Sequence, residues 1–572
     1  MIPLWLTIAF AVPSQPPPPP PPPRAAADSE STLRSARRAQ RNFESFRRQH
    51  LPVQYGPHGD RCDVHIGRFC FWYGDHDKKE DSIPEPSVIQ EARQRLLADL
   101  AEAAALVPGD PWIAGQRTRY LVEAGQATEA VREVRECRST PWWCSALAGY
   151  ALHAAGRFED ADSAFSAALR AMPDDERCRW HDVAPLLPGD LRGRYERMSC
   201  EERAAFESRW WWLAAPLLSR PGNDRRTEHF ARLTLADITS KSTTAYDERW
   251  DDDLREVLLR FGREVYWTQE PSPYVSNPKP FIAGHEREPA FHFVPSGDVV
   301  DAPGRATPAD WRLDAERPEE WYSPPYADRF ARLDAQVAAF RRSDSCVAIA
   351  SYDGSKDPTL AHQAALATLV MARDDRSRVQ AQRETHLDGP EVLTTTVTCE
   401  PQLLSLEIVP ARARWVARLR YGMTFGERGG VSDLLLLEPF DSLPADLASA
   451  LHHVLATTRI PAGGRLGLFW EVHGLSPSGE MVTTSLAVRP RGGGWLRHTV
   501  EALGLAARRA AVELEWDEVL APESTGDPTV AERAITLDLA GVPPGLYRIE
   551  LVVTARGRAP FTTSREIEII SP

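Results

Sequence analysis

Two pairs of residues in this 572-residue chain have the types and spacing that acid–base chemistry needs. On one expected strand, Glu471 and His473 alternate with apolar neighbours and therefore share a face. Such a pair could transfer protons, although it is more often a solvated pair or a pair at a sheet edge. The second pair, Glu228 and His229, lies on an expected helix, where a structural role is favoured. Glycine-rich phosphate loops and the Gly-x-Ser-x-Gly nucleophile motif are absent. We therefore predict no catalytic residue, and a site assembled from distant residues stays open.

Two stretches are candidates for metal binding, and neither has a standard ligand spacing. His285 and His292 are separated by Pro289, which breaks the helix that a zinc protease motif requires. The acidic run Asp251 to Asp253 lacks the alternating oxygen ligands and central glycine of a calcium loop. Acidic residues at this position fit the start of a helix instead. The sequence predicts no metal and no cofactor.

The cysteines fall into four sequential pairs, each within one expected structural unit. An even, locally paired set is typical of disulfides in an exported protein. Zinc is the alternative for the first pair, because His58 and His65 lie in the same loop, but the spacing matches no zinc module. Connectivity does not follow from sequence order alone; the pairs that we expect are Cys62–Cys70, Cys137–Cys144, Cys178–Cys200 and Cys346–Cys399.

The N-terminus indicates export. The apolar run from Ile2 to Val12 resembles a signal peptide and is too short to span a membrane. The unbroken proline run from Pro16 to Pro23 is either an extended spacer or a low-complexity tail. No later stretch is long and apolar enough to span. We expect an exported protein that is periplasmic, envelope-associated or extracellular, and its net charge of −14 argues against nucleic-acid binding.

Residues 31–49 form an expected basic amphipathic helix. Leu33, Phe43 and Phe46 lie on one side, whereas Arg37 and Arg41 lie on the other. Such a helix either lies on an anionic membrane surface or packs against the next unit with a solvated arginine face. We favour packing.

Residues 87–180 contain an internal helical repeat. Gly156 suits a turn between two helices, and Pro173 follows the second helix. The stretch from Trp142 to Pro173 resembles a tetratricopeptide repeat, and a weaker copy lies upstream at Leu121 to Val134. The resemblance implies a short array that presents a groove to a peptide partner or to another domain of the same chain.

The stretch from Cys200 to Gly262 separates this helical part from a strand-rich part. It resembles the GWxTD domain of bacterial secreted proteins, for which no activity can be carried over. Arg249, Asp252 and Ala215 depart from the family pattern. The matching positions are Phe206, Trp210, Asn223, Glu228, His229, Arg232, Trp250, Asp253 and Gly262.

The remaining part, residues 345–572, consists of alternating strands with Gly/Pro turns, which is typical of β-sandwiches. We expect Phe330 to Phe340 to form a short helix before them. The fold class is a multi-domain α+β protein with a helical array, a central helical segment and immunoglobulin-like sandwiches. The expected units are a signal peptide (1–14), a proline-rich linker (15–30), a helix with a cysteine loop (31–86), the repeats (87–185), the GWxTD-like segment (186–300), a second linker (301–343) and two sandwiches (344–460 and 461–572).

The absence of a catalytic motif favours a non-catalytic exported scaffold or adaptor of the cell envelope that binds protein partners through its helical repeats. The first alternative is a hydrolase or glycan-processing enzyme. The second is a glycan-binding module that uses exposed aromatic side chains such as Trp267, Trp321 and Tyr322. Carboxylates facing a cleft would favour the enzyme, and a repeat face free of contacts with its own chain would favour the adaptor.

Overall fold

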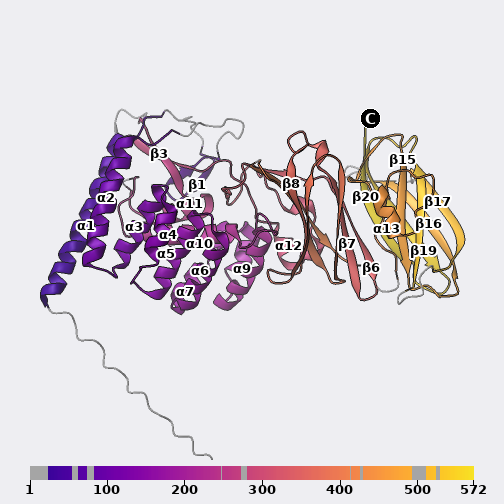
Figure 1. Cartoon of the computed structure of the whole chain (residues 1–572), viewed down its shortest axis with the longest axis horizontal. Helices are drawn as coiled ribbons and strands as arrows, with labels where there is room; N and C mark the ends of the chain where they lie inside the picture. Colours follow the sequence, from indigo (N-terminus) through magenta and orange to yellow (C-terminus); the bar gives the residue numbers. More distant parts are fainter. Residues whose placement is uncertain are drawn as a thin grey trace, which may run out of the picture.

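A computed structural model describes residues 23–54, 62–73, 83–246, 248–271, 280–412, 414–425, 430–491, 511–522 and 529–571. Helices make up the N-terminal half and strands the C-terminal half, and the parts follow one another along the long axis of the molecule (Figure 1). In this part of the chain no helix is both long enough and apolar enough to cross a membrane. The expected signal peptide lies outside the described residues.

The helical half contains eleven described helices and two small hairpins. The helices are α1 Pro23–His50, α2 Ser87–Leu106, α3 Pro111–Glu123, α4 Ala127–Val134, α5 Pro141–Ala154, α6 Phe158–Ala171, α7 Asp174–Trp180, α8 Gly189–Tyr195, α9 Cys200–Ala214, α10 Asp224–Thr239 and α11 Asp252–Phe261. The hairpins join β1 Val64–Ile66 to β2 Phe69–Phe71, and β3 Glu264–Glu270 to β4 Phe281–Glu286. Helix α1 begins at Pro23, so residues 23–30 of the expected proline-rich linker are helical, whereas residues 15–22 lie outside the described residues.

Helices α3 to α6 form two antiparallel pairs. Gly149 permits the close approach of α5 and α6, because a Cβ atom at this position would lie within 2.6–2.7 Å of the Phe165 ring. Gly125 and Gly156 make the turns within the two pairs, with φ angles of +72° and +73°. The turn that the sequence predicts at Gly156 is therefore present.

Helix α10 packs across α3 and α5, the first helices of the two pairs, and also contacts α6. Gly115 of α3 faces Ile238, where an added Cβ would lie 3.1 Å from the side chain. Gln116 donates to the carbonyl of Ile238 at 3.1 Å, and His153 of α5 contacts Glu228 at 2.7 Å. The chain thus covers this face of the two helix pairs with its own helix.

The first sandwich has a three-stranded and a five-stranded sheet, with strand orders β10-β7-β6 and β5-β12-β11-β8-β9. Their inner faces share one apolar core that includes Ala348, Leu369 and Leu406. All neighbours are antiparallel except β5 and β12. The strands are β5 Arg329–Arg332, β6 Ala335–Arg342, β7 Ser345–Asp353, β8 Ala364–Ala372, β9 Arg378–His386, β10 Pro390–Thr398, β11 Gln402–Pro410 and β12 Trp415–Met423.

The second sandwich has the strand orders β13-β15-β18 and β14-β20-β19-β16-β17. Its two sheets share an apolar core that includes Leu468, Trp470 and Leu551. The strands are β13 Leu435–Leu437, β14 Arg459–Pro461, β15 Arg465–His473, β16 Glu480–Pro490, β17 Val512–Leu520, β18 Val530–Asp538, β19 Gly545–Ala555 and β20 Phe561–Ile570; a short helix, α13 Leu447–Ala450, precedes β14.

Apolar layers join the three parts. The outer face of the five-stranded sheet in the first sandwich packs on α8, α9 and the short helix α12, Gly297–Asp301, through residues such as Val370 and Trp210. On the opposite side, Phe340 and Ile349 of the three-stranded sheet belong to one apolar cluster with Phe469 of the second sandwich. The helical half and both sandwiches are therefore joined through buried faces.

The eight cysteines form the four disulfides expected from their order, Cys62–Cys70, Cys137–Cys144, Cys178–Cys200 and Cys346–Cys399. Because Cys62 and Cys70 are bonded to each other, neither offers a thiolate to zinc. His58 lies outside the described residues. The structure thus favours the disulfide interpretation of this loop.

Two sequence expectations about the strand-rich part are wrong. Phe330 to Phe340 contributes strands β5 and β6 rather than a helix, because both faces of β6 are buried and its apolar run has no polar alternation. The second sandwich includes β13 and β14, so its strands begin before residue 461. The first error arises because short apolar stretches of helix and buried strand look alike in sequence. The second arises because the sequence does not show which sheet a strand joins.

Candidate functional site

The residues of the GWxTD resemblance that lie on α10 hold neighbouring elements together. Asn223 caps the helix by accepting from Arg226 N at 3.0 Å, and its amide donates to the carbonyl of Trp211 at 2.7 Å. Arg232 donates to the carbonyls of Leu259, Arg260 and Trp321 at 3.0–3.1 Å. Two of these bonds satisfy carbonyls at the end of α11.

Gly262 belongs to the same arrangement, because its backbone has a φ of +109° and an added Cβ would lie 3.1 Å from the Arg232 guanidinium. Glu228 receives Arg232 Nε at 2.7 Å and His153 on its other oxygen. Burial alone would raise the pKa of Glu228, but Arg232 and His153 hold it well below its usual range. The carboxylate is therefore engaged in structural pairs.

His229 is fully buried against Trp211, with ring centroids 4.9 Å apart, and neither ring nitrogen has a hydrogen-bond partner among the described residues. Burial, and then the neighbouring Arg225 and Arg232, lower its pKa well below the ordinary value. His229 is thus a neutral packing residue at ordinary pH. Glu228 and His229 point to different neighbours and do not form an acid–base pair.

The other residues of the resemblance also have packing roles. Phe206 and Trp210 are buried in α9, and Trp250 is partly buried against the helical core. Asp253 pairs with Arg68 at 3.3 Å, which ties the start of α11 to the first hairpin. In that hairpin Phe71 stacks on Phe261, whereas the neighbouring Trp72 is exposed.

Glu471 and His473 lie in the junction between the sandwiches rather than in solvent. Arg342 of β6 donates to both Glu471 oxygens at 2.6 and 2.7 Å. Burial, and then Arg342 and Arg341, lower the pKa of His473 to about 4. Arg342 lies 129 positions away from Glu471 in the chain, so no local sequence pattern marks it as the partner.

The aromatic side chains considered for glycan stacking do not form an exposed strip. Trp321 and Tyr322 are buried, with Trp321 packed against Phe71 and Phe261. Trp267 is partly buried beneath the Arg47 guanidinium, 4.8 Å from the ring centroid. A glycan site at these residues is therefore not supported.

The β3–β4 hairpin brings two carboxyl groups together, Glu264 and its cross-strand partner Glu286. Tyr246 donates to Glu264 at 2.6 Å. Burial, and then the neighbouring Glu264 carboxylate, raise the pKa of Glu286 to about 8. At neutral pH Glu286 therefore holds a proton that an unfolded glutamate has lost.

The Glu286→Gln variant is expected to lack a loss of folding stability that the wild-type chain shows as pH rises. The folded chain keeps the Glu286 proton between about pH 4.5 and 8, so stability falls as pH rises through this window. After allowance for the partial exposure of the side chain, the wild-type chain should lose about 1–2 kcal/mol more than the variant between pH 5 and 8. Urea unfolding at both pH values measures this difference. The control is Glu91→Gln, a change at an exposed position of α2; equal pH dependence in the wild-type and Glu286→Gln chains would contradict the prediction.

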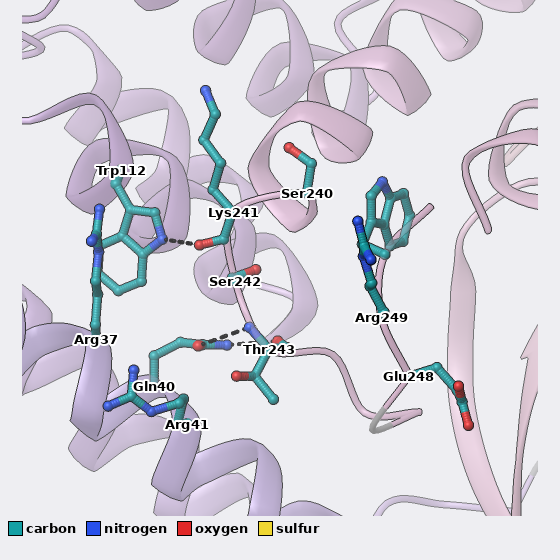
Figure 2. Close-up of a pocket in the computed structure, with 11 residues that line it drawn as sticks. Arg37, Gln40, Arg41, Trp112, Ser240, Lys241, Ser242, Thr243, Glu248 and Arg249 are labelled. Carbon is teal, nitrogen blue, oxygen red and sulfur yellow. Dashed lines mark hydrogen bonds between the residues drawn. The ribbon is translucent and has the colours of Figure 1, made fainter. Parts of the chain in front are cut away.

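A pocket of about 560 Å³ lies between α1, α3 and the segment that follows α10. It is lined mainly by polar and cationic side chains, which Figure 2 shows on both sides of an open centre. The lining residues are Arg37, Gln40, Arg41, Trp112, Ser240, Lys241, Ser242, Thr243, Glu248, Arg249 and Trp250. The arginine face of α1 follows from the sequence pattern, whereas the segment opposite it has no pattern that marks it as a pocket wall.

Hydrogen bonds fix the pocket wall (Figure 2). The Gln40 amide donates to the carbonyl of Thr243 at 2.8 Å and accepts from its backbone N–H at 3.2 Å. Trp112 donates to the carbonyl of Lys241 at 2.9 Å. Helices α1 and α3 therefore position the backbone of residues 241–243. Within the described residues no group of three or more His, Cys, Asp or Glu side chains is arranged to hold a metal ion.

No family model matches the chain, and no curated protein matches it. One solved structure, described as "Crystal structure of tetra-tandem repeat in extending region of large adhesion protein", aligns with 41% of this chain at 11% identity and a TM-score of 0.14. The alignment spans 49% of that protein. A likeness at this TM-score carries no argument about fold or function.

Proposed function

We propose that this chain is an exported, non-catalytic scaffold of the bacterial cell envelope that binds protein partners through its helical half. The observation that carries the proposal is the way in which buried contacts join the helical half to the first sandwich and the first sandwich to the second. The residues with the most suggestive chemistry, Glu228, His229 and Glu471, are all used in internal packing or ion pairs. A protein built in this way holds two ends at a fixed separation.

The scaffold proposal differs in one respect from a simple repeat adaptor. Since α10 covers α3 and α5, that face is occupied by the same chain. A partner would therefore contact other exposed parts of the helical half. The four disulfides support an oxidising, exported setting. Resemblance to tetratricopeptide and GWxTD proteins remains part of this proposal.

Site-specific photo-crosslinking in intact cells tests partner binding. A photoreactive amino acid would replace Val88 or Leu106, both exposed on α2, and Met481 or Val519, both exposed on the second sandwich. Single replacements at these exposed positions leave the helix packing intact, whereas a deletion of residues 87–180 would destroy it. The proposal expects one protein to crosslink reproducibly at the α2 positions but not at the sandwich positions. If no protein crosslinks at the α2 positions, or if the crosslinking yield is equal at all four positions, the result would count against binding through the helical half.

If the two ends of the molecule are held at a fixed separation, the junction between the sandwiches must be rigid, and this can be tested. Glu471→Gln removes the buried charge that receives both Arg342 donors, and because Arg342 is partly exposed we expect a loss of only about 1–2 kcal/mol. Spin labels carried by unnatural amino acids at Glu384 and Val519, one on each sandwich, would report the distance between them. The distribution should broaden in the variant, and an unchanged distribution would show that the ion pair does not fix the junction.

A further inference from the structure

The pocket in Figure 2 carries more positive than negative charge, although the chain as a whole has a net charge of −14. Its charged lining residues are the cations Arg37, Arg41, Lys241 and Arg249 and the single carboxylate Glu248. A cationic pocket on an acidic protein is a local feature that the overall charge does not explain. An anionic ligand would complement it.

These cations have few internal partners in the described part of the chain. The side chains of Arg41 and Lys241 make no ion pair or hydrogen bond there, although Lys241 acts on Asp237 electrostatically. Arg37 lies over the Trp112 ring, 5.6 Å from its centroid. Arg249 pairs with Asp251 at 3.3 Å while remaining highly exposed. Most of the donor capacity on these side chains is therefore free for a ligand.

The backbone segments that carry Arg37, Arg41 and Lys241 are also held in place before any ligand binds. Arg37 and Arg41 are four residues apart on α1 and therefore lie on one side of the helix. Gln40, between them, fixes α1 to Thr243, and Trp112 fixes α3 to Lys241. Cations that are positioned on rigid elements lose less conformational freedom when they bind.

We propose that this pocket binds a phosphate-bearing ligand. Guanidinium groups present several N–H donors in a planar fork that matches the oxygens of a phosphoryl group, and an ammonium group adds a compact charge. The volume of about 560 Å³ leaves room for the group that carries the phosphate. Such a group can come from a free phosphate ester or from a phospholipid headgroup.

Binding of defined probes to the full chain tests the proposal. Inorganic phosphate and glycerol phosphate would be titrated calorimetrically, and vesicles of phosphatidylcholine with or without phosphatidylglycerol would be used for co-sedimentation. The double variant Arg41→Gln/Lys241→Gln removes two exposed cations without breaking an internal pair. Arg38→Gln is the matched control, because Arg38 is exposed on α1 and lies outside the pocket lining.

The proposal expects at least one phosphate probe to bind with a Kd below about 1 mM and to bind at least about tenfold more weakly to the double variant. Arg38→Gln should leave this affinity unchanged, and added salt should weaken it. If the chain binds the soluble probes but no vesicles, the ligand is a free phosphate ester. If it binds vesicles that contain phosphatidylglycerol but not vesicles of phosphatidylcholine alone, the ligand is a phospholipid headgroup. Failure of every probe to bind, or equal binding to the wild-type chain and the double variant, would overturn the proposal. None of these outcomes depends on the protein partner of the scaffold.

Discussion

Replacing Glu320 by Ala should destabilise the helical half by about 3–5 kcal/mol, because it leaves a buried arginine without its counter-charge. Arg225 and Glu320 are both fully buried, and Arg225 Nε donates to Glu320 at 2.9 Å. His292 contacts the other Glu320 oxygen at 3.1 Å. Burial alone would raise the pKa of Glu320, but Arg225 and His292 hold it at about 2. The carboxylate is therefore charged at all ordinary pH values, and Arg225 depends on it.

Guanidinium unfolding at pH 7 measures this effect. The matched control is Asp328→Ala, which breaks the exposed pair between Asp328 and Arg414 and should cost no more than about 1 kcal/mol. The double variant Arg225→Met/Glu320→Leu should lose less folding stability than the Glu320→Ala variant, because it removes both charges and leaves neither unpaired. A single variant as stable as the Asp328 control would show that the buried pair is not needed.

The pH dependence has a definite sign. Because the folded pKa of Glu320 lies below its ordinary value of 4.5, the stability that it contributes is present above about pH 4.5 and is lost as pH falls towards 2. The Glu286 contribution runs in the opposite direction and in a higher pH window. Measurements at pH 3, 5 and 8 therefore separate the two groups.

Replacing Glu407 by Ala should uncouple the helical half from the first sandwich. Glu407 lies on the outer face of the five-stranded sheet and accepts from the backbone N–H groups of Leu218 and Ser219 at 2.7 and 2.9 Å. Ser405 donates to it at 2.6 Å, and Arg420 lies 3.9 Å away. Removal of this carboxylate leaves several buried donors without an acceptor, and we expect a loss of about 3–5 kcal/mol at the junction.

Arg420 and Arg418 define the rest of this junction. Arg420 donates to the carbonyl of Leu213 at 2.8 Å, and Arg418 donates to the carbonyl of Pro216. Together they satisfy carbonyls at and after the end of α9. Both arginines are buried, so the loss of Glu407 also removes a negative charge that offsets theirs.

Tryptophan fluorescence reports on this junction, because Trp210, Trp211 and Trp212 lie in α9. In the Glu407→Ala chain the helical half and the first sandwich should unfold in two separated transitions, which lie closer together in the wild-type chain. Protease should also cut the variant sooner between α9 and α10. Glu384→Ala is the control, since Glu384 is exposed on β9 of the same sheet and should change stability by less than about 0.5 kcal/mol. Identical unfolding of the two variants would contradict the prediction.

Local sequence patterns determined several parts of this protein. Helix α10 begins at Asp224 because Asn223 supplies a side-chain cap, and Gly156 makes a turn with a positive φ angle. Gly149 permits the approach of the next helix along the chain. Cysteine order agrees with the four disulfides because each pair lies within a short distance along the chain or within one sheet sandwich. These features depend on contacts that sequence spacing can reveal.

Tertiary structure alone decided the partners of the charged residues. Glu471 pairs with Arg342, Glu407 receives N–H groups from the segment after α9, and Arg225 pairs with Glu320. Each pair joins elements that are 95 to 189 residues apart, and no periodicity encodes such a contact. The same is true of the cationic pocket, whose opposite walls come from α1 and the segment after α10. The sequence by itself determined the local elements, whereas packing between them decided which charged groups were buried in pairs and which were left free to bind a ligand.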